Sequence, residues 1–109
     1  RSTLFPYTTL FRSLAEDRQE EVRLLAGSVE AMVVVGGKNS GNTRRLAQIA
    51  QECGVFATHV ETADELPLEE LARYPRMGLT AGASTPAWII EDVVQTLCRR
   101  FGCESRSNE

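Results

Sequence analysis

Two loops rich in small polar residues hold the side chains whose types and spacing are best suited to chemistry. They read GGKNSGNT at residues 36–43 and AGASTP at residues 81–86. Serine, threonine and asparagine supply hydrogen-bonding groups, and glycine lets the backbone approach a ligand because it has no Cβ atom. Each loop precedes an expected helix, whose first backbone N–H groups lack partners and whose dipole favours anions. The two loops therefore predict a site for an anion such as a diphosphate.

The same residue types have an alternative role, because Ser, Thr, Asn and Gly are also the ordinary residues at helix starts. Under that interpretation the chain is an α/β interaction domain without a ligand.

The first loop is not a P-loop: Gly36 and Gly41 have the required separation, but Asn42 stands where the motif needs lysine. An anion held by both loops would receive four or five hydrogen bonds, each worth roughly 1.5–3 kcal/mol, without a cation.

A second alternative is a flavodoxin-like FMN-binding domain, because Ser-Gly-Asn-Thr at residues 40–43 resembles the phosphate loop of such domains. That function would require aromatic side chains that stack on the flavin. Outside residues 1–13 the aromatic residues are Phe56, Tyr74, Trp88 and Phe101. None of them lies in an obvious flavin loop, so this alternative lacks its expected stacking partners.

Hydrophobic patterning places the two loops at the ends of strands. Short apolar runs rich in β-branched residues predict strands at 32–35, 55–60 and 77–80. Helical spacing predicts helices over 16–26, between the first loop and Gly54, over 66–72, and from Pro86 onward. This alternation predicts a three-layer αβα domain of the α/β class with a small parallel sheet. If the first and third strands are neighbours, both loops lie at one sheet edge, where such sheets bind ligands.

Composition limits the functions that the chain can have. At 109 residues and 42% apolar content it corresponds to about one domain. A net charge of −3, without a basic block longer than a pair, argues against nucleic acid as a partner. No run of eighteen apolar residues occurs, so we expect no membrane association. Three cysteines at irregular spacing argue against a disulfide framework and favour a reducing compartment such as the cytoplasm.

The first thirteen residues, RSTLFPYTTLFRS, differ in composition from the charged segment that follows. They contain no acidic residue and resemble a conceptual translation of a common sequencing-adapter oligonucleotide. We interpret residues 1–13 as an assembly artefact and exclude them from the fold; the alternative is a genuine edge strand. The expected organisation is therefore an α/β domain over 14–102 and a tail over 103–109.

The two loops and their flanking strands carry a more specific resemblance. The segments VVVGGKNSGNTRRLAQIA and GLTAGASTPAWIIEDVV are similar to the C-terminal third of the 4-hydroxy-3-methylbut-2-enyl diphosphate reductase family. The similarity extends over about residues 16–97. It implies that Ser40, Gly41, Asn42 and Ser84 bind the substrate diphosphate, and that this domain is one of three similar domains in the parent enzyme.

The resemblance also implies the parent activity. These enzymes belong to the methylerythritol phosphate pathway of isoprenoid biosynthesis in the bacterial cytoplasm. They reductively remove a hydroxyl group from an allylic diphosphate, which yields isopentenyl and dimethylallyl diphosphate. They are iron–sulfur oxidoreductases with a 4Fe–4S cluster on three cysteines, and a ferredoxin or flavodoxin supplies the electrons.

The cluster pattern of the family is broken in this chain. The family motif Cys-x-Ala-Thr-x-x-Arg-Gln ends on Arg18 and Gln19, which places a cluster cysteine at the position of Arg12. We therefore expect no metal site, no bound cluster and no catalytic residue here, and we expect the chain alone to be inactive.

The cysteines and the histidine that are present have simpler interpretations. Cys53 falls on the apolar stripe of an expected helix and should be buried. Cys98 and Cys103 lie in or after the last helix, away from the ligand-binding edge of the sheet. We expect His59 to pack within its strand, and the acidic residues of 61–70 to face solvent.

Overall fold

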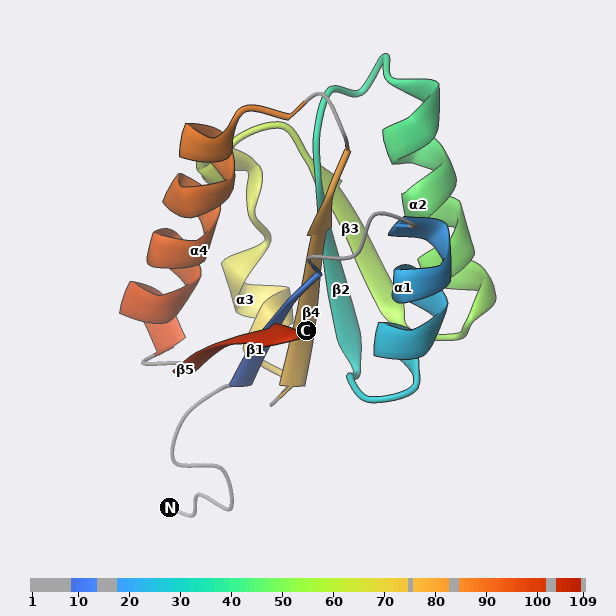
Figure 1. Cartoon of the computed structure of the whole chain (residues 1–109). Helices are drawn as coiled ribbons and strands as arrows, with labels where there is room; N and C mark the ends of the chain where they lie inside the picture. The colour runs from blue at the N-terminus through green and yellow to red at the C-terminus, as the bar shows by residue number, and fades with distance from the viewer. Residues whose placement is uncertain (1–8, 14–17, 75, 83–84, 102–103, 109) are drawn as a thin grey trace.

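Five parallel strands form the central sheet of this computed structural model, in the order β3-β2-β4-β1-β5 (Figure 1). The structure describes residues 9–13, 18–74, 76–82, 85–101 and 104–108. The strands are β1 (Thr9–Ser13), β2 (Ala31–Val35), β3 (Phe56–Val60), β4 (Arg76–Ala81) and β5 (Glu104–Asn108). The helices are α1 (Arg18–Ala26), α2 (Gly41–Glu52), α3 (Leu68–Leu71) and α4 (Ala87–Phe101), with a 3₁₀ turn at Ala63–Glu65.

The helices cover both faces of the sheet, as the α/β prediction requires. Helices α1 and α2 lie on one face, and α3 and α4 lie on the other (Figure 1). Alternate residues of β2 face the two helical layers. Met32 and Val34 pack towards α1 and α2, whereas Val33 and Val35 pack towards α3 and α4. All five residues of β2 are buried, because a parallel strand between two helical layers has no solvent-facing side.

The helix that follows the first loop was predicted well, except at its end. Leu46, Ile49 and Ala50 are buried as the apolar stripe predicts. The prediction that Cys53 is buried was wrong: it is the exposed C-cap residue beyond Glu52. The helix stops before the stripe reaches this position, and Gly54 follows with φ +89°, a conformation that favours glycine after a helix.

The predicted helix over 66–72 is shorter in the structure. The 3₁₀ turn ends at Glu65, and the helical turn of α3 starts only at Leu68. Pro67 separates them with ψ 74°, outside the helical region, so Leu66 and Pro67 are not helical. The buried Leu71 anchors α3 to the core.

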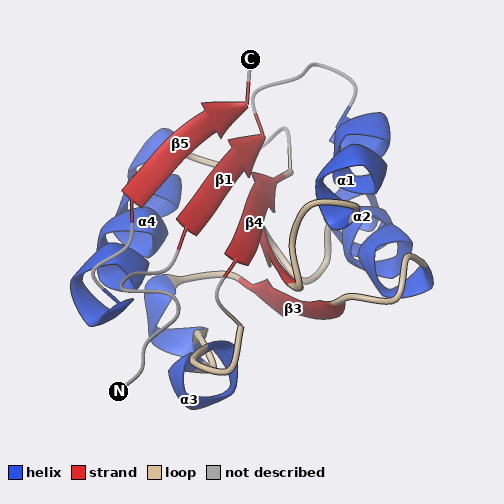
Figure 2. Cartoon of the chain, turned by 90° about the horizontal axis from the view of Figure 1, so that it is seen from below, coloured by secondary structure: helices blue, strands red, loops and turns tan. Residues whose placement is uncertain are grey.

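Two strands lie outside the predicted sheet. Thr9–Ser13, which we excluded from the fold, pairs with β4, and Glu104–Asn108, predicted as part of a tail, pairs with β1 (Figure 2). Strand β1 is an internal strand and not the edge strand of the alternative interpretation. The physical reason is the exposed backbone of β4: without β1 its second side would present unpaired N–H and C=O groups, which favour addition of an extended segment.

Candidate anion-binding site

The loops after β2 and β4 meet at the carboxyl edge of the sheet. Strands β2 and β4 are hydrogen-bonded neighbours, and Val35 lies opposite Ala81 in the parallel register. Just beyond this pair, the backbone N–H of Gly82 donates to the carbonyl of Val35 at 3.0 Å, and the hydroxyl of Thr85 donates to it at 3.2 Å. The predicted convergence of the two loops is therefore present in the structure.

A buried threonine fills the space between the two loops. Thr43, in the first turn of α2, has no solvent-exposed surface. A Cβ atom added to Gly36 would lie 2.6 Å from Thr43 Oγ1, and one added to Gly82 would overlap the same atom. Glycine is required at both positions because the backbone of each loop lies directly against this hydroxyl.

The start of α2 presents hydrogen-bond donors to solvent. Ser40 is the N-cap residue, with extended backbone angles, and its Oγ accepts a hydrogen bond from Thr43 N at 3.3 Å. Gly41 and Asn42 are the first two residues of the helix, and both are exposed. N–H groups at these positions have no acceptor within the helix, so they are available to an anion.

The charge around the start of α2 is positive. Arg44 and Arg45 are both exposed, and the first turn contains no acidic residue. Gly41, Arg44, Arg45 and Gln48 line a shallow hollow of about 380 Å³. Two guanidinium groups beside free N–H groups favour a negatively charged ligand.

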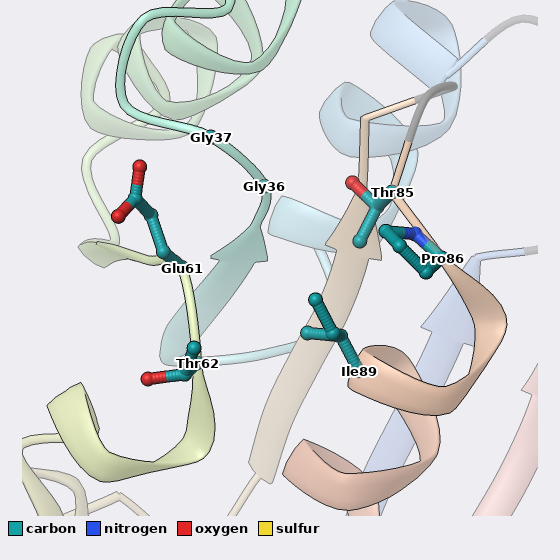
Figure 3. A pocket seen from close by; sticks show the side chains of 7 residues that line it. All are labelled: Gly36, Gly37, Glu61, Thr62, Thr85, Pro86 and Ile89. Atoms are coloured by element: carbon teal, nitrogen blue, oxygen red, sulfur yellow. The ribbon is translucent and has the colours of Figure 1, made fainter.

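A second hollow, also of about 380 Å³, is lined by Gly36 and Gly37 of the first loop and by residues that follow β3 and β4 (Figure 3). Its polar side chains include Glu61, Thr62 and Thr85, and Pro86 and Ile89 form an apolar wall opposite Glu61. The Glu61 carboxylate makes this hollow unfavourable for a diphosphate. The lining of the first hollow, with Arg44 and Arg45, has the charge that is more favourable to an anion.

The loop after β3 supports the first loop through two glutamates. Glu61 Oε2 accepts a hydrogen bond from the Lys38 backbone N–H at 2.7 Å, and Glu65 Oε1 accepts one from the Glu61 N–H at 2.9 Å. The Glu65 carboxylate also lies 3.5 Å from Lys38 Nζ. The backbone hydrogen bond from Glu61 and the charge of Lys38 lower the pKa of Glu65 below its usual value.

His59 has a more specific role than the expected packing within its strand. The side chain is partly buried, and its Nε2 lies 3.0 Å from the carbonyl oxygen of Gly36. Because a carbonyl only accepts, His59 must donate from Nε2. Sequence reasoning missed His59, Glu61 and Thr43 as supports of the loop, since each acts across segments that are distant in sequence.

The predicted site residues are only partly within the described chain. Ser40, Gly41 and Asn42 are consecutive at the start of α2. Ser84 lies outside the described residues, although Gly82 and Thr85 on either side of it are in place.

The residues present do not fit an iron–sulfur cluster. In the described ranges, His, Cys, Asp and Glu side chains do not gather in groups of three that could hold a metal ion. Position 12, where the family pattern has a cluster cysteine, is an arginine in β1, and its guanidinium is not a metal ligand. Cys53 is exposed, Cys98 is partly buried on α4, and Cys103 lies outside the described residues.

A protein-family comparison identifies the group to which this domain is related. The model of a family described as LytB protein matches residues 13–98, most of the chain. The chain belongs to the LytB protein family. This membership argues against the flavodoxin-like alternative.

Two relatives of this chain have the same name and come from different organisms. A 4-hydroxy-3-methylbut-2-enyl diphosphate reductase from Nitratidesulfovibrio vulgaris is 56% identical over 80 residues, which cover 73% of this chain and 28% of the relative. The enzyme of the same name from Aquifex aeolicus is 51% identical over 84 residues, covering 74% of this chain and 29% of the relative. The chain thus spans less than a third of the length of these relatives.

Solved structures agree with the fold of this LytB chain. A structure of (E)-4-hydroxy-3-methyl-but-2-enyl diphosphate reductase superimposes with a TM-score of 0.71 at 50% identity, covering 75% of this chain and 29% of that one. The Plasmodium falciparum reductase gives a TM-score of 0.76 at 23% identity, covering 84% and 30%, which supports the fold alone. None of the helices in the described ranges has the length and apolar character needed to cross a bilayer.

Proposed function

We propose that this chain is the diphosphate-binding part of a 4-hydroxy-3-methylbut-2-enyl diphosphate reductase. Ser40, Gly41, Asn42 and Ser84 would hold the substrate diphosphate. The observation that carries the proposal is the junction of the two loops on Thr43, which brings the start of α2 next to Gly82 and close to Thr85. The positive charge of Arg44 and Arg45 supports the same assignment.

In the parent enzyme we propose a reductive dehydroxylation. Two electrons and two protons convert the allylic alcohol to the alkene products, the C–O bond breaks, and the oxygen leaves as water. A 4Fe–4S cluster would supply this chemistry in the parent, with electrons from a ferredoxin or flavodoxin. Because Arg12 replaces the expected cluster cysteine, this chain contributes diphosphate binding and is inactive by itself.

We further propose the organisation of the chain and its setting. Residues 1–13 are foreign to the natural protein; the start of the family match at residue 13 supports this, whereas the pairing of Thr9–Ser13 with β4 counts against it. The domain around residues 14–102 is one of three similar domains of a bacterial cytoplasmic enzyme, and its sheet also includes Glu104–Asn108. Neither nucleic acid nor a membrane is a partner.

Calorimetric titration of the chain with inorganic pyrophosphate tests the proposed function. Wild type should bind, and Ser40→Ala and Asn42→Ala should each weaken binding by about tenfold or more, the value of one hydrogen bond to a charged oxygen. Gln51→Ala, an exposed residue near the other end of α2, is the matched control. Equal affinities for all four proteins would contradict the proposal, and so would turnover of the substrate by this chain after cluster reconstitution.

A further inference from the structure

Both hydrogen bonds that Ser40 Oγ accepts in the first turn of α2 come from one residue. The backbone N–H of Thr43 lies 3.3 Å from Ser40 Oγ, and the Thr43 hydroxyl lies 3.1 Å from it. Thr43 is fully buried, whereas Ser40 is partly exposed. The buried Thr43 therefore controls the orientation of the hydroxyl of the partly exposed Ser40.

The orientation follows from the valence of a hydroxyl group. A serine hydroxyl has two lone pairs and one hydrogen. Because Thr43 donates to Ser40 Oγ twice, both lone pairs are engaged on the helix side. The Ser40 hydrogen must then point away from Thr43, so an anion on that side would meet a donor and not a lone pair.

Thr43 itself is held in place by the two loops. The added-Cβ contacts at Gly36 and Gly82 show that both backbones lie against Thr43 Oγ1, and Thr85 Oγ1 would lie 3.1 Å from a Cβ on Gly36. The two backbones enclose the Thr43 hydroxyl. Rotation of the Thr43 side chain is therefore opposed by close packing. The packing of the loops is thereby coupled to the direction of the Ser40 hydroxyl.

We infer that Thr43 is a positioning residue, which aims the Ser40 hydroxyl at the bound diphosphate without touching the ligand itself. This inference rests on the proposed function, because it assigns the purpose of the Ser40 hydroxyl. Under this inference Thr43 connects Ser40 to the junction of the two loops. The affinity of the site for an anion then depends on the buried hydroxyl of Thr43.

Variants of Thr43 separate the hydroxyl from the packing. Thr43→Val removes the hydroxyl at nearly constant volume and keeps the backbone N–H, so inorganic pyrophosphate should bind about three- to tenfold more weakly. Thr43→Ser restores the hydroxyl and should recover most of this affinity. If Thr43→Val fails to fold, comparison of Thr43→Ala with Thr43→Ser isolates the hydroxyl in the same way, since neither has the methyl group.

A double-mutant cycle with Ser40→Ala shows whether Thr43 acts through Ser40. In the Ser40→Ala background, Thr43→Val should have no further effect on pyrophosphate affinity, because there is no hydroxyl left to orient. An equal loss in both backgrounds, or unchanged affinity of Thr43→Val in the folded protein, would overturn the inference and leave the proposed function intact. Absence of pyrophosphate binding by wild type would overturn both.

Discussion

Glu61 accepts a hydrogen bond from the backbone N–H of Lys38 at 2.7 Å, and this contact joins the loop after β3 to the loop after β2. The same carboxylate lines the second hollow, opposite Pro86 and Ile89 (Figure 3). Glu61 thus holds the loop after β2 in place through a hydrogen bond, while its negative charge disfavours the binding of an anion. The two effects can be separated, because one depends on an acceptor oxygen and the other on net charge.

Glu61→Gln should strengthen pyrophosphate binding. The glutamine keeps a carbonyl oxygen that accepts from Lys38 N–H but removes the negative charge near the site. We expect affinity to rise by about two- to fivefold at low ionic strength and by less in 0.15 M salt, where the Debye length is about 8 Å. Titration calorimetry at two salt concentrations measures this. Glu61→Ala is the comparison, since it also loses the hydrogen bond; a salt-independent effect of Glu61→Gln would contradict the electrostatic explanation.

Glu65 should make stability depend on pH in the acid range. Its pKa is lowered in the folded state by the hydrogen bond from Glu61 N–H and by Lys38. A lowered pKa stabilises the fold above the pKa of the unfolded state, and this contribution is lost as pH falls through the folded-state value. Urea unfolding between pH 7 and pH 3 should therefore show a gap between wild type and Glu65→Gln that closes in acid. A gap independent of pH would refute the assignment; Glu69→Gln, on the exposed side of α3, controls for loss of a surface carboxylate.

The parts of the fold that were predictable are those determined by local pattern. The β-branched run ending at Val35 forms a buried parallel strand, and the stripe through Leu46 and Ile49 forms the inner face of α2. The loops were predicted as one anion site because parallel strands present their carboxyl ends on one edge. By contrast, the role of Thr43 depends on Gly36 and Gly82, which approach it from two different strands.

The elements that were missed depend on pairing over long sequence distances. Strand β1 pairs with β4, which lies more than sixty residues later, and β5 pairs with β1. Composition argued against residues 1–13, and local pattern contains no information on which extended segment completes the open side of β4. Cys53 was misplaced for a different reason, because a difference of one residue in the end of a helix decides whether its last stripe position is buried.

Gly82→Ala should destabilise the domain because its methyl group would overlap Thr43 Oγ1. Thr43 is enclosed and cannot move aside without disturbing the loops, so the cost should be about 1–3 kcal/mol. Chemical denaturation measures the free energy of unfolding. Gly41→Ala is the matched control, since a Cβ there meets no described heavy atom within 4 Å and alanine favours a helix. Equal stabilities of the two variants would contradict the close packing of Gly82 on Thr43.

Thr80→Val should stabilise the fold, whereas the same substitution of the buried Thr43 should not. Thr80 is 1% exposed in β4, and its Oγ1 has no hydrogen-bond partner within the described part of the chain. Valine has nearly the same shape and removes a buried polar atom that water would otherwise solvate, a gain of about 1 kcal/mol. Thermal unfolding should show a rise in Tm of about 4 °C. Thr43→Val, which removes a hydroxyl that donates to Ser40 Oγ, should lower Tm instead. A fall in Tm for both variants would mean that the Thr80 hydroxyl has a partner in solution.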